Sequence, residues 1–263
     1  MSTRVFEDAK TYTSWDDHFY HPAALRFYDE AIAAMLGMLS LRPGDAVVDA
    51  GCGVGVHSVR AVRHGYRVHA VDVSPTALAL AQRRASEAAA DRVTFVRGDL
   101  TALAFRDASV GAMFSWGVII HIPEIERALD ELVRVLKPGG RLALYVTNGA
   151  CADDALRAVA RSLVRRHRPQ TRARLGTGAW YAMDDEQIWI WQLDVPALTA
   201  YLEERGLRCL DRLAGELTQL HIHLPRAVRP LFHRANNAWF KLRRRLPAWP
   251  TAMNLLVFEK RPA

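Results

Sequence analysis

The chain has 263 residues, half of them hydrophobic, and a formal net charge of +7. This length suits a single domain with some added elements, and no apolar run reaches the roughly 18 residues of a membrane-spanning helix. Met1 to Lys10 has no signal-peptide core, and the three cysteines (Cys52, Cys151 and Cys209) match neither a disulfide framework nor a metal site. We therefore expect a cytoplasmic protein without a metal ion.

The first expected element is an amphipathic helix over residues 22–39. Its apolar residues recur at helical spacing, namely Leu25, Tyr28, Ile32, Met35, Leu36 and Leu39. Aromatic and histidine side chains precede it: Tyr12, Trp15, His18, Tyr20 and His21. We expect residues 1–40 to form a lid over a ligand or, alternatively, an apolar cluster beneath this helix.

A glycine-rich turn follows the first expected strand, at 45–50, and leads into a helix near 54–64. The strand ends in Asp49, and the turn reads Gly51-Cys52-Gly53-Val54-Gly55. Such a turn brings backbone N–H groups close to a bound ligand, because glycine has no Cβ atom in the way. The dinucleotide-binding pattern G-x-G-x-x-G would need its third glycine at position 56, where Val56 stands.

Acidic residues end the next two expected strands. Asp72 follows the strand at 66–71, about 20 residues after the turn, where a carboxylate accepts hydrogen bonds from both hydroxyls of a ribose. Val73 and Ser74 lead into a helix at 75–89, with Ser74 as its N-cap. Asp99 and Leu100 follow the strand at 92–97, where a carboxylate can accept from an exocyclic amine such as that of adenine.

Strands are also expected at 110–115 and 141–146, with a helix at 123–136 between them. From Asp49-Ala50-Gly51-Cys52-Gly53-Val54-Gly55 to Leu136-Lys137-Pro138-Gly139-Gly140, the chain resembles the class I S-adenosylmethionine-dependent methyltransferases. The resemblance implies seven strands in the order 3-2-1-4-5-7-6, with the seventh antiparallel. It also implies an S-adenosylmethionine site formed by Asp49, Gly51, Cys52, Gly53, Gly55, Asp72, Val73, Asp99, Leu100 and Ser115.

His121 is the candidate catalytic base. It follows the fourth strand on the loop that faces the expected site, and imidazole titrates near neutral pH. A general base is useful when the methyl acceptor is a hydroxyl that must lose its proton. The alternative is a wall residue that packs on the methionine end of the cofactor.

The alternating pattern breaks after Thr147. We expect insertions near 148–192 and 222–250, a helix at 196–205, and strands at 207–213 and 254–260. The fold class is therefore α/β, a Rossmann-like doubly wound seven-stranded sheet with helical cap insertions. The whole chain would be one domain, with a lid at 1–40, a cofactor-binding core at 41–147 and a C-terminal half at 148–263.

Both insertions are distinctive in composition. Arg157, Arg161, Arg165, Arg166, Arg168, Arg172 and Arg174 occupy a stretch without acids, and a second basic stretch runs from Arg226 to Arg245. The second mixes cations with Leu231, Phe232, Trp239, Phe240 and Leu242, which is typical of an amphipathic helix that lies on a bilayer, covers a lipid-like substrate or packs on the core. Trp180, Tyr181, Trp189 and Trp191 would form either a pocket wall or a small second core. An ordinary solvated helix face would also explain the arginines.

The leading functional hypothesis is methyl transfer to a small molecule, with O-methylation of a specialised metabolite, sugar or lipid-like acceptor. An RNA methyltransferase that uses the arginine-rich stretches is one alternative. It is disfavoured because Ser115-Trp116-Gly117-Val118 stands where a base-methylating motif of the Asn-Pro-Pro-Tyr type would be. A cofactor-dependent lyase or cyclase and a non-catalytic binding scaffold are the others. The oligomeric state is left open.

Overall fold

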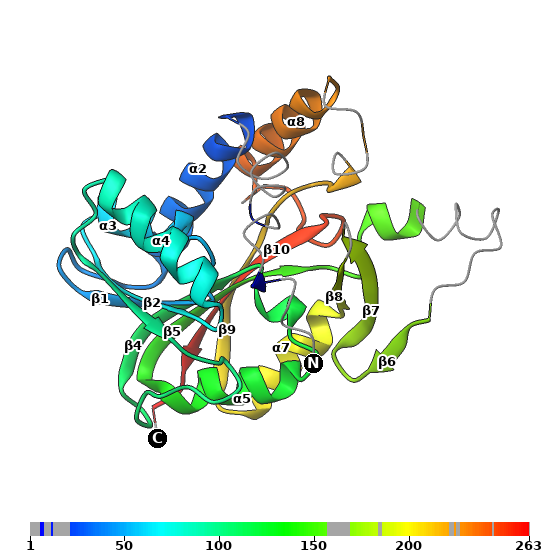
Figure 1. Ribbon diagram of the computed structural model, residues 1–263. Helices are drawn as coiled ribbons and strands as arrows, with labels where there is room; N and C mark the ends of the chain where they lie inside the picture. Colours follow the sequence, from blue (N-terminus) through cyan, green and yellow to red (C-terminus); the bar gives the residue numbers. More distant parts are fainter. Residues whose placement is uncertain are drawn as a thin grey trace.

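A seven-stranded sheet forms the centre of the computed structural model, which describes residues 6–7, 12, 22–156, 169–183, 186–220, 224, 227–243 and 245–262 (Figure 1). Its strands are β1 (Ala46–Ala50), β2 (Arg67–Asp72), β3 (Val93–Arg97), β4 (Val110–Trp116), β5 (Leu136–Thr147), β9 (Leu207–Ala214) and β10 (Met253–Lys260). The helices are α2 (Pro22–Met38), α3 (Val56–Arg63), α4 (Pro75–Glu87), the short 3₁₀ helix η2 (Ile119–His121), α5 (Ile125–Val135), α7 (Val195–Glu204) and α8 (Arg229–Lys241).

The strand order is β3-β2-β1-β4-β5-β10-β9. Strands β1 to β5 pair in parallel, and β10 is antiparallel to both β5 and β9. Because β6, β7 and β8 form a separate sheet, β9 and β10 are the sixth and seventh strands of the main one. The predicted order 3-2-1-4-5-7-6 with an antiparallel seventh strand is therefore confirmed.

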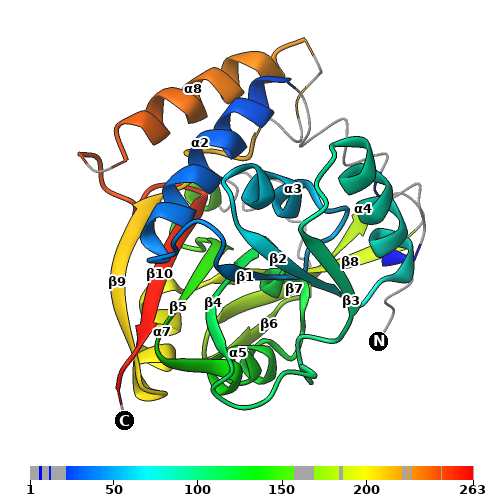
Figure 2. The same cartoon turned by 90° about the vertical axis from the view of Figure 1, so that its left-hand side faces the viewer.

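Hydrophobic layers cover both faces of the sheet. Alternate residues of a strand point to opposite faces, and in β5 Leu142 and Leu144 join a core with α5 and α7, whereas Ala143 and Tyr145 join one with α2 and α3. Figure 2 shows α2 and α3 on one side of the sheet and α5 and α7 on the other. The carboxyl ends of the parallel strands therefore lie at one edge, between the two helical layers.

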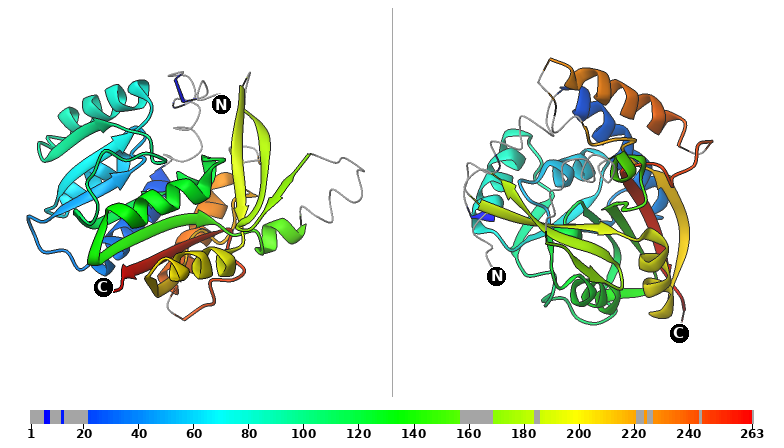
Figure 3. Two further views of the ribbon diagram at one scale, coloured as in Figure 1. Left: turned by 90° about the horizontal axis from the view of Figure 1, so that it is seen from below. Right: turned by 90° about the vertical axis from the view of Figure 1, so that its right-hand side faces the viewer.

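The first insertion differs from the helical cap that the sequence predicts. Residues 152–156 are helical, but from 171 onward the described chain forms a three-stranded antiparallel sheet, with β6 (Thr171–Ala173), β7 (Gly176–Met183) and β8 (Glu186–Leu193). The segment is rich in tryptophan, isoleucine and glycine, which favour strands and tight turns over helix. Figure 3 shows this sheet standing across the end of the main one. Arg157, Arg161, Arg165, Arg166 and Arg168 lie outside the described residues.

The second insertion contains the predicted helix. It is α8, which packs alongside α2 and contributes Phe240 to the core, with its ring 5.1 Å from that of Phe27.

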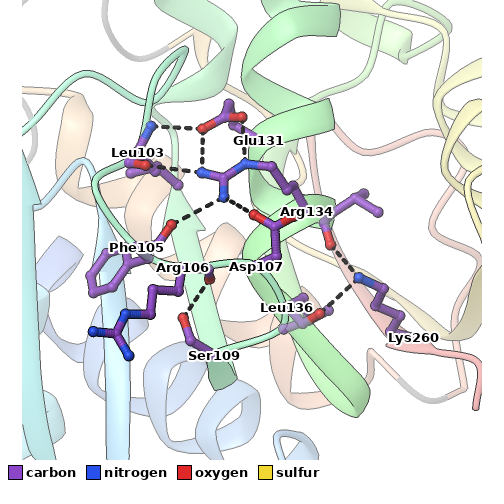
Figure 4. A network of polar contacts seen from close by, with 10 residues as sticks. Leu103, Phe105, Arg106, Asp107, Ser109, Glu131, Arg134, Leu136 and Lys260 are labelled. Atoms are coloured by element: carbon purple, nitrogen blue, oxygen red, sulfur yellow. Dashed lines mark hydrogen bonds and ion pairs between the residues drawn. The ribbon is translucent and has the colours of Figure 1, made fainter.

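A polar network fixes the connection between β3 and β4 onto α5 (Figure 4). The guanidinium of Arg134 donates to the carbonyls of Leu103 and Phe105 and to the carboxylates of Glu131 and Asp107. Glu131 accepts in turn from the Leu103 amide at 2.8 Å, and its hydrogen bond with Arg134 holds the pKa of its carboxyl below the usual value. These contacts fix the chain shortly after Asp99, and with it the end of β3.

Candidate functional site

The glycine turn after β1 is closed on one side and open on another. Gly51 has φ +85°, and a Cβ atom placed on it would lie 2.3 Å from the Cγ1 atom of Val118, in the loop after β4. Gly53 has φ +50°, and apart from its chain neighbours no atom of the described residues lies within 4 Å of its Cβ position. The amides of Gly51 and Cys52 both donate to the Val71 carbonyl, at 2.8 and 2.9 Å, which ties the turn to β2. A ligand can therefore approach the backbone at Gly53, whereas Gly51 packs against protein.

Asp72 lies directly beside this opening. One carboxylate oxygen accepts from the Gly53 amide at 2.8 Å, and the other accepts from the Ser74 amide at 2.9 Å. Ser74 then caps α4 by accepting from the Ala77 amide at 3.0 Å, as the sequence predicts. Each carboxylate oxygen keeps a second lone pair, so Asp72 can accept two further hydrogen bonds from a ligand. Burial raises the pKa of Asp72, and the neighbouring Val73 is 38% exposed.

Asp49 contacts the helix that follows the turn. The carboxyl is buried and accepts from the Ser58 hydroxyl of α3 at 2.6 Å. Burial raises the pKa of Asp49 to about 7. The contact between Asp49 and Ser58 holds the helix into which the turn leads. Cys52 is buried, and burial raises the pKa of its thiol, so it stays protonated and unreactive at neutral pH.

Asp99 is exposed at the end of β3, and the adjacent Leu100 is buried. One Asp99 oxygen accepts from both the amide and the hydroxyl of Thr101, each at 2.8 Å. The Gly98 amide donates to the Asp72 carbonyl at 2.9 Å, which places the ends of β2 and β3 side by side. Asp72 and Asp99 therefore face the same edge of the sheet.

The end of β4 adds Ser115, which is buried, and whose hydroxyl oxygen has no hydrogen-bond partner among the described residues. The next residue, Trp116, points to the opposite face. Its ring stacks on Tyr145 with 3.9 Å between centroids and lies 4.9 Å from the His57 ring. Burial lowers the pKa of His57 well below its usual value. The stack joins residues that are paired across β4 and β5, so the sequence alone does not predict it.

His121 is held by a strand of the inserted sheet. Its Nδ1 atom lies 2.9 Å from the carbonyl oxygen of Trp189 in β8. A carbonyl can only accept, so Nδ1 carries the proton and Nε2 of the neutral ring keeps its lone pair. Burial lowers the pKa of His121, which favours this neutral form. The His121 amide also donates to the carbonyl of Val118, the residue that packs against Gly51.

Two tryptophans of the first insertion belong to the hydrophobic core and hold strand β8 in place. Trp189 and Trp191 are buried and belong to the hydrophobic layer with α5, whereas Trp180 is 39% exposed. The Trp191 indole N–H donates to the Ile122 carbonyl at 2.9 Å, and the Thr147 hydroxyl donates to the Trp191 carbonyl at 2.5 Å. Of the two expected roles, core packing applies to Trp189 and Trp191. Strand β8 is thereby docked on the loop that carries His121.

Three described N-terminal residues lie over the turn. The Phe6 carbonyl accepts from the hydroxyls of Ser74 and Tyr12, and the Phe6 ring lies 6.2 Å from that of His121. The Glu7 carbonyl accepts from the Thr76 hydroxyl at 2.8 Å. Tyr12 is buried against Val54, Val56 and Ala77. Trp15, His18, Tyr20 and His21 of the expected lid lie outside the described residues.

The acidic side chains around the turn fit S-adenosylmethionine better than a dinucleotide. Asp49, Asp72 and Asp99 place carboxyl groups around the turn. The open space at Gly53 leaves room for a ligand to lie against the backbone of the turn. Carboxylates suit ribose hydroxyls, an adenine amine and a sulfonium charge, and they would repel a pyrophosphate. Within the ranges that the structure describes, no group of three or more His, Cys, Asp or Glu side chains could hold a metal ion.

Comparison with known proteins agrees with this assignment. A family model described as a methyltransferase domain matches residues 48–144. A 27-O-demethylrifamycin SV methyltransferase of Amycolatopsis mediterranei (strain S699) is 35% identical over 134 residues, which cover 49% of this chain and 48% of that protein. A demethylmenaquinone methyltransferase of Clavibacter sepedonicus is 33% identical over 197 residues, or 71% of this chain and 74% of that protein.

The fold also has counterparts among solved structures. The PH0226 protein of Pyrococcus horikoshii OT3 aligns with a TM-score of 0.63 at 17% identity, over 97% of this chain and 100% of that one. Among the sequence relatives, the chain spans about half the length of the Amycolatopsis protein and about three quarters of the Clavibacter protein.

Proposed function

This chain belongs to the class I S-adenosylmethionine-dependent methyltransferases, and from this premise we propose that it methylates a hydroxyl oxygen of a small molecule. The acceptor would be a specialised metabolite, a sugar or a lipid-like compound. When bound, the cofactor supplies a methyl group already activated by its sulfonium, for transfer by in-line displacement. The protein must then position the acceptor, exclude water and remove one proton.

The state of His121 carries this proposal. With Nδ1 donating to the Trp189 carbonyl at 2.9 Å, the lone pair on Nε2 is available to accept the proton of the acceptor hydroxyl. The lowered pKa keeps the ring neutral at physiological pH, as a base must be before the reaction. An amine that arrives neutral would need no such base.

Cofactor binding is assigned to the residues around the turn. Asp72 would accept from the two ribose hydroxyls through its free lone pairs, and Asp99 from the adenine amine. Gly51, Cys52, Gly53 and Gly55 would form the backbone cradle, with Val73 and Leu100 against the adenine and the unpaired Ser115 hydroxyl near the methionine end. The described residues Phe6 and Tyr12 support a lid role for the N-terminal segment.

A small acceptor is favoured by the relatives. The two relatives above are named for a demethylated rifamycin and a demethylated menaquinone, both small organic molecules. Their acceptors differ from each other, so the identity of the acceptor here is a matter for experiment. No described helix is long and apolar enough to cross a membrane.

The test is a transfer assay with trideuteromethyl-labelled cofactor and panels of hydroxylated quinols, polyketides, sugars and lipids, read by mass spectrometry. We expect one labelled methyl group on an oxygen of one acceptor class, and its loss in His121→Gln. A product isomeric with its substrate would instead identify a cyclase. Label found only in RNA would identify an RNA methyltransferase, and absence of cofactor binding by calorimetry would leave a scaffold.

A further inference from the structure

Helix α8 has a well-anchored inner face. His233, Asn236 and Phe240 are buried, and the Asn236 side chain exchanges hydrogen bonds with the backbone of Thr218 at 3.0 and 3.1 Å. The helix lies on the outer side of α2, at the periphery of the molecule (Figures 1 and 2). Its opposite face therefore points away from the other helices and strands that the structure describes.

That outer face is apolar. At 100° per residue, Leu231, Ala235, Ala238 and Leu242 fall on one stripe of the helix. All four are exposed, Leu231 at 63% and Leu242 at 45%. Among the described residues, seven large hydrophobic side chains are exposed, and four of them lie between 228 and 249: Val228, Leu231, Leu242 and Trp249. Within this set Leu231 and Leu242 lie on one helical stripe, and an exposed apolar stripe of this kind is a candidate interaction surface.

The segment that carries the stripe has charges of one sign. From Leu217 to Phe258 the sequence contains seven lysines and arginines and no acid. Arg234, Lys241 and Arg245 are exposed, and a carboxylate oxygen of Glu30 in α2 lies 3.9 Å from the Lys241 amine. All 28 acidic residues of the chain lie outside this segment and the similar acid-free segment 155–183. The partner of this cationic surface should therefore be negatively charged.

From the apolar stripe and its cationic border, we propose that the outer face of α8 is a docking surface for a membrane that carries anionic lipids, and that Trp249, in the segment after α8, adds an anchor. A helix that lies in a membrane interface combines a shallow apolar face with flanking Lys and Arg, and exposed tryptophan prefers the same depth. Trp249 is 63% exposed, as such an anchor must be before it binds. The surface would bring the enzyme to acceptors that partition into lipid.

Other occupants fit less well. A second copy seated on the same patch would bring two acid-free cationic segments together, which costs association free energy through like-charge repulsion. RNA would pair with the cations but would leave the leucine stripe in water. An anionic bilayer satisfies both the charge and the apolar stripe.

The experiment is co-sedimentation of the full chain with phosphatidylcholine vesicles that contain either no anionic lipid or about 30% phosphatidylglycerol, a composition in the range where surface charge matters. We expect binding to the anionic vesicles at least tenfold tighter than to the neutral ones, and weaker binding at high salt. Leu231→Glu with Leu242→Glu, and separately Arg234→Glu with Arg245→Glu, should each reduce the affinity at least tenfold. These positions are exposed, so the variants should keep the wild-type melting temperature.

The matched control is Arg63→Glu with Arg106→Glu, an equal charge change at exposed positions near the amino ends of the strands. It should bind anionic vesicles within about twofold of wild type. If the net charge of the protein alone caused the attraction, both charge variants would lose affinity equally. Equal losses in the two charge variants, unchanged binding of the double leucine variant, or a dimer that the leucine substitutions dissociate would each overturn the proposal. So would salt-sensitive RNA binding without vesicle binding. None of these outcomes depends on which acceptor is methylated.

Discussion

The imidazole Nδ1 of His121 and the carbonyl oxygen of Trp189 are 2.9 Å apart, although the two residues lie 68 positions apart in the chain. The bond joins the loop after β4 to the strand β8 of the inserted sheet. Because β8 is itself held by Thr147 and by the Trp191 indole, the histidine has a fixed ring orientation and tautomer. An insertion outside the main sheet thus determines which nitrogen of His121 keeps its lone pair.

His121→Ala should lower the rate of methyl transfer at saturating cofactor by roughly 10²- to 10⁴-fold, the usual contribution of a general base. Cofactor affinity, measured by calorimetry, should stay within about twofold, because the assigned cofactor contacts lie elsewhere. In the wild-type enzyme, burial lowers the pKa of His121, so the rate should fall only on the acid side, with an inflection below the ordinary value of 6.5. An unchanged rate in the variant would rule out the base.

Asp72→Ala should weaken cofactor binding by about 2–5 kcal/mol, because it removes a buried acceptor and leaves its donors unpaired. Asp72→Asn should fall between wild type and alanine. Its amide oxygen can still accept from Gly53, but its NH₂ group cannot accept from Ser74. Asp91→Ala, at an exposed position before β3, is the control for the loss of one negative charge. Calorimetric titration measures all three, and equal affinities for wild type and Asp72→Ala would remove the basis of the ribose assignment.

Gly51 and Gly53 should respond differently to the same substitution. In Gly51→Ala the new Cβ meets Val118 at 2.3 Å, so we expect a lower melting temperature, partly restored by Val118→Ala. In Gly53→Ala the Cβ meets no protein atom, and the cost to the fold is limited to the positive φ, about 1–2 kcal/mol. Its cofactor affinity should nevertheless drop at least tenfold, since the methyl group would occupy the ligand's approach. Normal binding in Gly53→Ala would show that the cofactor does not lie over this residue.

The sequence was sufficient for the turn and its acids because their chemistry is local. Gly51 and Gly53 need conformations that glycine supplies, and Asp72 and Asp99 follow directly from the ends of their strands, so contiguous motifs identify them. The alternation of strands and helices likewise determined the order of the main sheet.

Contacts between distant segments were beyond the same reasoning. The stack of Trp116 on Tyr145 depends on the parallel register of β4 and β5, which no local pattern specifies. The sequence predicts a helical cap in the first insertion, yet the tryptophans and glycines after residue 170 form β structure. The support of His121 by Trp189 follows from that sheet, and it was missed with it.

The buried carboxyl of Asp49 makes a final prediction, on the pH dependence of stability. Burial raises its pKa to about 7 from an ordinary value of 3.8, against the opposing effect of the Ser58 hydroxyl at 2.6 Å. A group whose pKa is higher in the folded state binds its proton more tightly there, so its contribution to stability is complete below pH about 4 and is lost as the pH rises toward 7.

Asp49→Asn is neutral at every pH and of nearly equal size. Urea unfolding at pH 4.5, 6 and 7.5, spaced by design across that window, should therefore show the variant gaining stability relative to wild type as the pH rises. Asp91→Asn, at an exposed carboxyl, is the control and should follow the wild-type curve. Burial also raises the pKa of Glu216, to about 7. Asp49→Asn should therefore remove part of the fall in unfolding free energy with rising pH, and Glu216→Gln should remove a further part. If Asp49→Asn and wild type gave parallel curves, the carboxyl of Asp49 would have to be ionised in the folded protein throughout this range, and its bond to Ser58 would be that of a carboxylate.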